Sequence, residues 1–219
     1  MAHSGTTHDR ASEFFDRYAR DFNAIYGNEN TLFNTVVNHL FRKDMRVRYD
    51  AAIDGCRPVE GKSVLDVGSG PGHYSVALAQ MGASRCFGVD FADGMIDVAK
   101  RNAELGGVGK KCEFIYGDFL TAPIEGKFNF AIITGFMDYI KEPEKVIARV
   151  CDLTTEKAFF SFPSDGGLLA WQRKLRYKSR CDLYLYNEPQ IRRHFENVTK
   201  KPVSIERLER DFFVTLDMR

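Results

Sequence analysis

The sequence lacks paired cysteines, a long apolar run and an excess of charge of either sign. Its five cysteines form no C-x-x-C pair and are odd in number, which argues against a disulfide framework and a zinc site. No apolar run reaches the roughly 18–20 residues of a membrane-spanning helix, and residues 1–15 show no apolar stretch of a signal peptide. Lys and Arg number 31 against 30 Asp and Glu, so bulk charge favours neither nucleic acid nor a membrane as partner. We therefore expect a cytoplasmic protein without a metal site.

Two helices are predicted in the first quarter of the chain. Apolar side chains recur every three or four positions over residues 9–26 and again over residues 31–53. Aromatic residues crowd the first of these stripes. The stripe either packs on the rest of the protein as ordinary core, or it forms a lid in which Tyr18 and Tyr26 close over a bound ligand.

From residue 62 onward, strand patterns alternate with helix patterns. Five strands are expected, at 62–68, 85–91, 112–119, 128–136 and 157–163, and three helices between them, at 73–82, 93–105 and 142–153. We expect Asp93 to be the N-cap of the second of these helices. A basic helix (166–180), a short helix (189–197) and two closing strands (203–218) follow. The alternation of strand and helix patterns predicts an α/β fold, with a doubly wound, mostly parallel seven-stranded sheet.

The turn after the first strand has the pattern D-x-G-x-G-x-G, from Asp66 to Gly72. Glycines between a strand and a helix let a ligand approach the backbone and point the helix N-terminus at it. The carboxylate before the glycines would repel a pyrophosphate and suits a cationic ligand. Asp90 ends the second strand, where doubly wound folds place an acidic residue that accepts hydrogen bonds from ribose hydroxyls. A third acidic residue, Asp118, follows the next strand pattern.

These segments resemble the class I S-adenosylmethionine-dependent methyltransferases. The matching stretches are "VLDVGSGPG", "GVDFADGMIDVAK", "FIYGDF" and "FNFAIITGFMDYI", in the order and spacing of that family, within residues 61–162. The resemblance implies S-adenosylmethionine as cofactor and S-adenosylhomocysteine as product. It also implies one methyltransferase domain over 1–219. In this domain 1–57 are a helical cap, 61–162 the cofactor-binding core, and 163–219 an acceptor-side helical insertion and closing strands.

The resemblance further implies a set of cofactor-binding residues. Around the methionine part of the cofactor it places Asp66, Gly68, Ser69, Gly70 and Gly72, and at the ribose Asp90. At the adenine it places Phe91, Met95, Gly117, Asp118 and Phe119, with Asp118 at the amino group. Thr134 and Gly135 after the fourth strand, and Tyr18 and Tyr26 of the N-terminal stripe, complete the set.

Residues near the acceptor are less well defined by pattern. Asp138 and Tyr139 follow the fourth strand and could orient or deprotonate an acceptor, whereas the alternative for Asp138 is a cap of the loop or helix. His194 is expected on the surface. The basic run in 173–180 either recognises an anionic acceptor or covers a solvated helix face.

The sequence thus predicts a methyltransferase that acts on a small molecule, at oxygen or nitrogen. An anionic acceptor is one of the alternatives. No "NPPY"-like signature is present, which disfavours nucleobase and glutamine acceptors. The rival interpretations are an RNA or protein methyltransferase, a non-catalytic cofactor-binding protein, and a NAD-dependent reductase on a similar fold. We expect no membrane partner and disfavour nucleic acid; no pattern in the sequence sets an oligomeric state.

Overall fold

Seven strands form one sheet in the computed structural model, which describes residues 46–166, 183–208 and 210–219. The strands are β1 (Ser63–Val67), β2 (Arg85–Asp90), β3 (Cys112–Tyr116), β4 (Phe128–Ile133), β5 (Thr154–Pro163), β6 (Val203–Leu208) and β7 (Asp211–Asp217). The helices are one over 46–55, α3 (His73–Gln80), α4 (Asp93–Leu105), α5 (Pro143–Leu153) and α7 (Glu188–Glu196). Two short 3₁₀ helices are η1 (Gly109–Lys111) and η2 (Met137–Tyr139).

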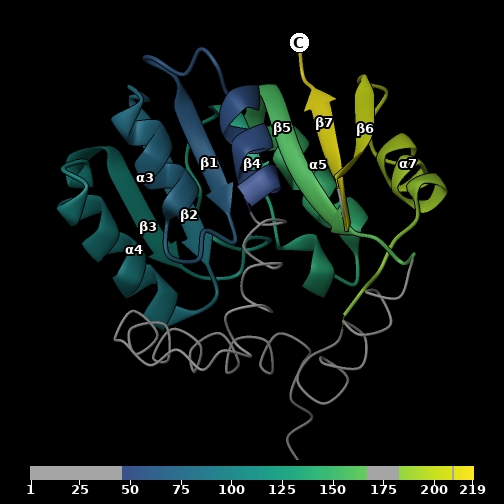
Figure 1. The fold of residues 1–219 in the computed structure, drawn as a ribbon, viewed down its shortest axis with the longest axis horizontal. Coiled ribbons are helices and arrows are strands. Elements are labelled where there is room, and N and C mark those ends of the chain that lie inside the picture. The colour runs from purple at the N-terminus through teal and green to yellow at the C-terminus, as the bar shows by residue number, and fades with distance from the viewer. Residues whose placement is uncertain (1–45, 167–182, 209) are drawn as a thin grey trace, which may run out of the picture.

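The sheet has the strand order β3-β2-β1-β4-β5-β7-β6 (Figure 1). The first five strands are parallel, and β7 pairs antiparallel with both β5 and β6. The predicted doubly wound, mostly parallel seven-stranded sheet is therefore confirmed. The order of the parallel strands reverses between β1 and β4, and open α/β sheets bind ligands at such a reversal, outside the carboxyl ends of the strands.

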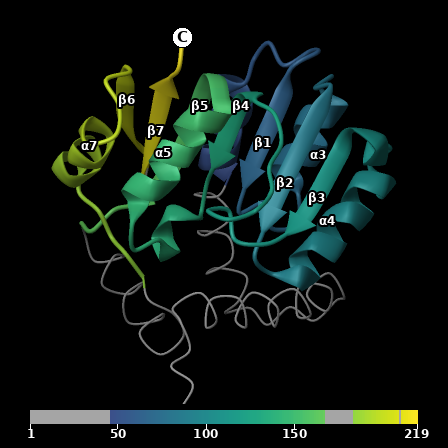
Figure 2. The ribbon, with the colours of Figure 1, turned by 180° about the vertical axis from the view of Figure 1, so that it is seen from behind.

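Helices cover both faces of the sheet. The helix over 46–55, α3 and α4 bury one side of it around side chains such as Ala52, Leu78 and Ile96. Helices α5 and α7 bury the other side around Ile147 and Phe195, as the view from behind shows (Figure 2). The continuous apolar runs of β1, β2 and β4 follow from this two-sided burial, because a strand covered on both faces has no solvent-facing residues.

Most predicted elements appear close to where the pattern put them, with differences at their ends. The N-cap of α4 is Ala92 and makes no side-chain capping bond; Asp93, predicted as the cap, is the first residue of the helix, where its charge still favours the helix dipole. Strand β5 begins at Thr154 rather than at residue 157. Helix α5 begins with Pro143, which fits the first helical position because no amide donor is needed there.

Several predictions fall outside the described residues. They are the helix over 9–26 with Tyr18 and Tyr26, most of the helix over 31–53, and the basic helix with its run over 173–180. Within the described part, the second N-terminal helix continues to residue 55.

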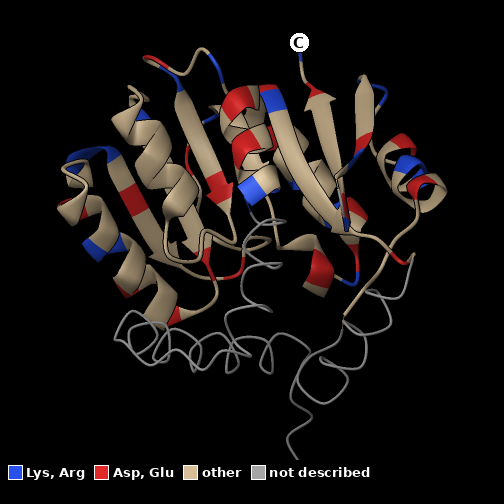
Figure 3. Ribbon diagram, in the orientation of Figure 1, with Lys and Arg blue, Asp and Glu red and all other residues tan. Residues whose placement is uncertain are grey.

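Residues of both charge signs are interspersed over the helices, the strands and the connecting loops of the described part, as the coloured ribbon shows (Figure 3). None of the helices in the described ranges is both long and apolar enough to cross a membrane.

Candidate functional site

The glycine turn between β1 and α3 contains glycines with two different tasks. Gly68, Gly70 and Gly72 all have left-handed φ angles, of 68°, 50° and 76°. A Cβ at Gly68 would lie 2.7 Å from the Phe136 ring, and one at Gly72 would lie 2.9 Å from the Phe114 ring, so these two glycines serve packing. A Cβ at Gly70 would meet no atom of the described residues within 4 Å. The turn therefore leaves open space beside its backbone at Gly70, where a ligand can approach.

Asp90 connects this turn to the end of β2. Its Oδ2 accepts a hydrogen bond from the Gly70 amide at 2.8 Å, and its Oδ1 accepts one from the Ala92 amide at 2.9 Å. The residue is only 8% exposed. Each carboxylate oxygen has a second lone pair, so further donors such as ribose hydroxyls remain compatible with this arrangement. Asp90 thus also supports the local structure, which its position at a strand end did not indicate.

Asp66 points into the interior between the sheet and α3. It is 2% exposed, and its Oδ2 accepts a hydrogen bond from the Ser75 hydroxyl at 2.8 Å. Burial raises the pKa of Asp66 to about 7; the Ser75 hydrogen bonds oppose the rise and the charge of Asp90 adds to it. A cation brought to this end of the sheet would favour the ionised form.

Ser69 lies between two of the glycines and is 5% exposed. Its hydroxyl is buried and has no hydrogen-bond partner among the residues that the structure describes. A buried hydroxyl of this kind costs free energy unless a ligand or water satisfies it. Among the described residues this hydroxyl has no partner, and it lies in the turn where the sequence predicts the cofactor.

The turn after β3 brings the third acidic residue to the same edge. Gly117 donates its amide to the Asp90 carbonyl at 2.9 Å, and Asp118 Oδ1 accepts from the Leu120 amide at 2.8 Å. Three of the residues predicted at the adenine have large side chains. Phe91 is half-buried, whereas Met95 is 4% exposed and Phe119 is 2% exposed.

The Phe119 ring is part of the core. It meets the Phe136 ring edge-on, with 6.4 Å between the ring centroids, and the Arg149 guanidinium lies 5.3 Å from its centroid. Its contact with a ligand stays a prediction.

The loop after β4 carries the predicted acceptor-side residues. Thr134 is half-buried. Gly135 is exposed and has a φ of 67°, and a Cβ there would meet no atom within 4 Å among the described residues. The Gly135 amide donates to the Ser161 hydroxyl at 2.9 Å. Asp138 lies in η2 and is 2% exposed, whereas Tyr139 is half-buried.

A segment before α7 holds this loop in place. The Tyr184 amide donates to the Asp138 carbonyl at 2.8 Å. The Tyr186 hydroxyl lies 3.2 Å from the Ile140 carbonyl and 3.4 Å from the Met137 carbonyl. Chain segments nearly fifty residues apart thus meet around the two residues predicted to contact an acceptor.

His194 is not the free surface residue that was expected. Its side chain is 24% exposed, and its Nδ1 lies 2.6 Å from Glu144 Oε1. Burial alone would raise the pKa of Glu144, but the hydrogen bond and charge of His194 hold it below its ordinary value. The pair connects α7 to α5.

Comparison with known proteins identifies the family of this chain. The methyltransferase domain family matches residues 58–179, which is more than half of the sequence. The chain therefore belongs to the methyltransferase domain family, whose methyl donor is S-adenosylmethionine. This confirms the predicted family, enzyme class and cofactor, and it decides against the NAD-dependent reductase.

Individual relatives share only part of this chain. It is 33% identical over 81 residues to the ribosomal protein L11 methyltransferase of Exiguobacterium sp., with 37% of this chain and 26% of the relative covered. It is 35% identical over 107 residues to the ubiquinone biosynthesis O-methyltransferase of Coxiella burnetii, with 47% of this chain and 44% of the relative covered. The chain thus spans less than half the length of these curated relatives.

One solved structure covers nearly the whole chain. It is magnesium protoporphyrin IX methyltransferase from Synechocystis PCC 6803 with bound S-adenosylhomocysteine. The TM-score is 0.71 at 20% sequence identity, with 98% of this chain and 100% of that chain covered. The likeness establishes the shared fold.

Four residues of this edge did not stand out in the sequence: Ser75, Ser161, Tyr186 and Arg48. A serine between phenylalanines, in "FFSFP", is a detectable signal, because a polar residue inside an apolar strand needs a hydrogen-bond partner. Arg48 is a second detectable signal. It precedes the fully buried Ala52 by one helical turn on the same helix face, and a charged residue on a buried face needs a partner.

Proposed function

We propose that this protein transfers a methyl group from S-adenosylmethionine to a small-molecule acceptor, at oxygen or nitrogen. The observation that carries the proposal is the bond between Asp90 and the Gly70 amide, which joins the glycine turn and the second acidic residue into one structure. The space beside Gly70, the unused Ser69 hydroxyl and the nearby carboxylates suit a cationic nucleoside ligand.

In this proposal the residues divide along the edge of the sheet. Asp66, Gly68, Ser69, Gly70 and Gly72 surround the methionine part of the cofactor. Asp90 accepts hydrogen bonds from the ribose, and Phe91, Met95, Gly117, Asp118 and Phe119 surround the adenine. Thr134 and Gly135 lie between cofactor and acceptor. Tyr18 and Tyr26 close the site from the N-terminal segment.

Methyl transfer is an in-line displacement at carbon, so the acceptor atom must be aligned with the methyl group and the sulfur. We assign this alignment to Asp138 and Tyr139, which belong to the loop that follows β4 at the same edge of the sheet as Gly70. The hydrogen bond from the Tyr184 amide to the Asp138 carbonyl limits the movement of that loop. We assign to Asp138 the orientation of the acceptor and, for a hydroxyl acceptor, the removal of its proton.

The small-molecule acceptor is supported by the ubiquinone biosynthesis relative, whereas the ribosomal protein relative keeps a protein acceptor as the second candidate. An anionic acceptor would be recognised by the basic run over 173–180. Cofactor binding without turnover would identify the non-catalytic alternative.

The proposal is tested in two stages. Calorimetry first measures S-adenosylmethionine and S-adenosylhomocysteine binding, with NAD as the negative control; failure of both adenosyl ligands to bind contradicts the proposal. Release of S-adenosylhomocysteine is then followed with panels of phenols, carboxylic acids, amines, RNA and protein. Turnover confined to RNA or protein would establish the macromolecular alternative.

An Asp138→Asn variant then tests the assigned role. It should bind S-adenosylhomocysteine as the wild type does and lose most of its turnover, by about 10²-fold or more if the carboxylate removes a proton.

A further inference from the structure

A buried chain of polar groups runs beneath the loop after β4. It begins at Asp211, the first residue of β7, whose Oδ2 lies 2.7 Å from Nη1 of Arg48 in the helix over 46–55. The same nitrogen lies 3.5 Å from the Ser161 hydroxyl of β5, and this hydroxyl accepts the Gly135 amide at 2.9 Å. Three elements distant in sequence thus meet below Gly135.

The ion pair is well buried. The Arg48 and Asp211 side chains are 14% and 5% exposed, and Ser161 is fully buried. Removing two charges from water costs as much as or more than their attraction returns, so well-packed apolar residues at such positions are often equally stable. Arg48 Nε is also buried with no hydrogen-bond partner in the described part of the chain. Stability alone is therefore a poor reason for a charged pair at this position.

The surroundings would readily accept apolar side chains. One turn after Arg48, Ala52 is completely buried in the apolar cluster that also contains Phe159 and Phe213. In the sheet, Ser161 pairs with Phe213 and Pro163 pairs with Asp211, so the polar groups lie beside apolar side chains of the two strands.

The contacts from Asp211 through Arg48 and Ser161 end at Gly135, at the start of the loop that follows β4. Gly135 adopts a left-handed φ of 67° and begins the turn that leads to Asp138. A serine hydroxyl has two acceptor lone pairs, and here one receives the Gly135 amide and the other faces Arg48. The guanidinium therefore restricts how the Ser161 hydroxyl can rotate, and through it the direction of the Gly135 amide.

We infer that Arg48 is a positioning residue of the methyl-transfer site, acting through Ser161 on the turn at Gly135. The inference rests on the proposed function for the role of that turn. Asp211 anchors the guanidinium, and the role assigned to Arg48 is indirect, through Ser161 and not through contact with cofactor or acceptor. Arg48 thereby makes the geometry of the β4 loop depend on the helix that precedes β1.

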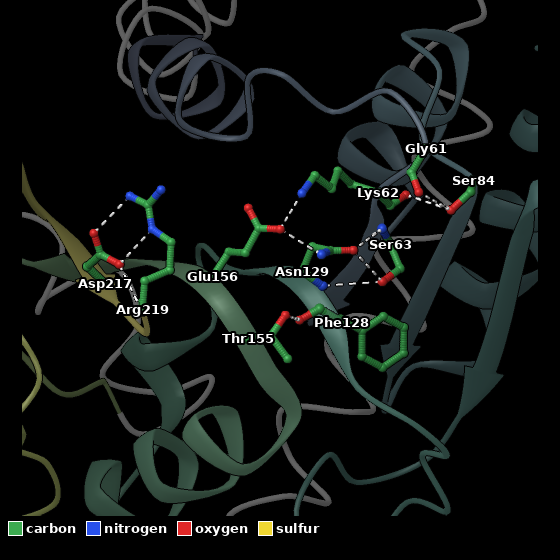
Figure 4. Close-up of polar contacts among 10 residues, drawn as sticks. All are labelled: Gly61, Lys62, Ser63, Ser84, Phe128, Asn129, Thr155, Glu156, Asp217 and Arg219. Atoms are coloured by element: carbon green, nitrogen blue, oxygen red, sulfur yellow. Dashed lines mark hydrogen bonds and ion pairs between the residues drawn. The ribbon is translucent and has the colours of Figure 1, made fainter.

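The test uses the full chain and removes the ion pair as a unit, in an Arg48→Met/Asp211→Asn variant. The matched control is Lys62→Met/Glu156→Leu. That pair is also partly buried, and it joins β5 to the start of β1 beside Asn129 and Ser63, in a polar cluster that does not include Gly135 (Figure 4). Ser161→Ala removes the link to Gly135 while leaving the ion pair intact.

Hydrogen exchange of the Gly135 amide, measured by NMR without ligand, is the first readout. It should speed up by about tenfold in Ser161→Ala and by at least several-fold in the Arg48 double variant. Calorimetry with S-adenosylhomocysteine is the second readout and should show affinity weakened by about threefold or more in both. The control double variant should leave both quantities as in the wild type.

Wild-type exchange at Gly135 and wild-type affinity in the Arg48 double variant would overturn the inference. Should that variant fail to fold, Arg48→Leu/Asp211→Leu decides: it replaces the pair by apolar side chains, which the surrounding cluster accepts, and Gly135 exchange should still accelerate. Unchanged exchange there also overturns the inference. If the wild type binds no S-adenosylhomocysteine, the proposed function fails, whereas the exchange data still test the link to Gly135.

Discussion

Replacing Gly70 by alanine should weaken cofactor binding strongly at a small cost in stability. An L-residue in the left-handed region costs roughly 1–2 kcal/mol relative to glycine. No other cost is expected from residues 46–166, 183–208 and 210–219, because an added Cβ at Gly70 meets none of their atoms within 4 Å. For a chain of this size, each 1 kcal/mol lowers the melting temperature by about 2–4 °C, so the variant should melt about 2–8 °C below the wild type.

The same methyl group would occupy the space through which the cofactor approaches the turn. Overpacking of a fitted contact costs about 1–3 kcal/mol, which corresponds to a loss of affinity of roughly fivefold to 150-fold. Calorimetry with S-adenosylhomocysteine measures this loss, and scanning calorimetry of the free protein measures the stability. A β-branched Gly70→Val variant should abolish binding.

Gly61 provides a matched control. It has a φ of 73°, and a Cβ there would also meet no atom within 4 Å in the part of the chain that the structure describes. Gly61, however, precedes β1 at the opposite end of the strand. Gly61→Ala should therefore melt like Gly70→Ala and bind the cofactor like the wild type. Gly72→Ala should instead lose stability by more than either, because its Cβ would lie 2.9 Å from Phe114. Equal affinities for Gly70→Ala and Gly61→Ala would refute the approach of the cofactor at Gly70.

Three further predictions concern polar side chains of the same edge. Asp90→Asn should lower stability by about 1–3 kcal/mol and weaken S-adenosylhomocysteine binding, because an amide group cannot accept both backbone hydrogen bonds. Denaturant unfolding measures the loss of stability, and calorimetry measures the loss of affinity. Unchanged affinity would contradict the role of Asp90 at the ribose. The pKa of Asp66 is raised to about 7 in the folded state, so the contribution of Asp66 to stability is greatest below pH 4 and falls as the pH rises to 7. The Asp66→Asn variant should therefore become more stable relative to the wild type as the pH rises from 4 to 7. A difference in melting temperature that stays constant over this range would exclude the raised pKa. Tyr186→Phe should cost about 1 kcal/mol and reduce turnover without weakening S-adenosylhomocysteine binding, since only the hydroxyl contacts to the β4 loop are lost; wild-type turnover would contradict this.

The fold could be predicted in most of its parts because its signals are local. Apolar runs bounded by glycines and prolines identify β1, β2 and β4, and helical periodicity identifies α4 and α5. The start of β5 could not be predicted in this way. Its first residues, Thr154 to Glu156, are polar, and they are recruited into the strand by pairing with β4 at Phe128 rather than by their own pattern.

The candidate site, like the fold, has parts that local sequence signals could predict and parts that they could not. Residues that act through the backbone turn or through a strand end could be recognised from spacing, because parallel strands bring their carboxyl ends to one edge. Contacts between distant segments could not. Nothing local indicates that Asp90 bonds the Gly70 amide, that His194 meets Glu144, or that Arg48 reaches β7. Each of these contacts depends on how complete elements pack.

The two carboxylates of this edge connect stability to function. Asp66 is buried at an energetic cost that its hydrogen bond to Ser75 reduces only in part, and the charge of Asp90 adds to that cost. An apolar residue in place of Asp66 would fit the surrounding interior better. The carboxylate becomes favourable when a cation approaches the same end of the sheet, since opposite charge stabilises the ionised form. The sulfonium and ammonium groups of S-adenosylmethionine are such cations. An electrostatic cost in the free protein is thus consistent with selective binding of a positively charged cofactor.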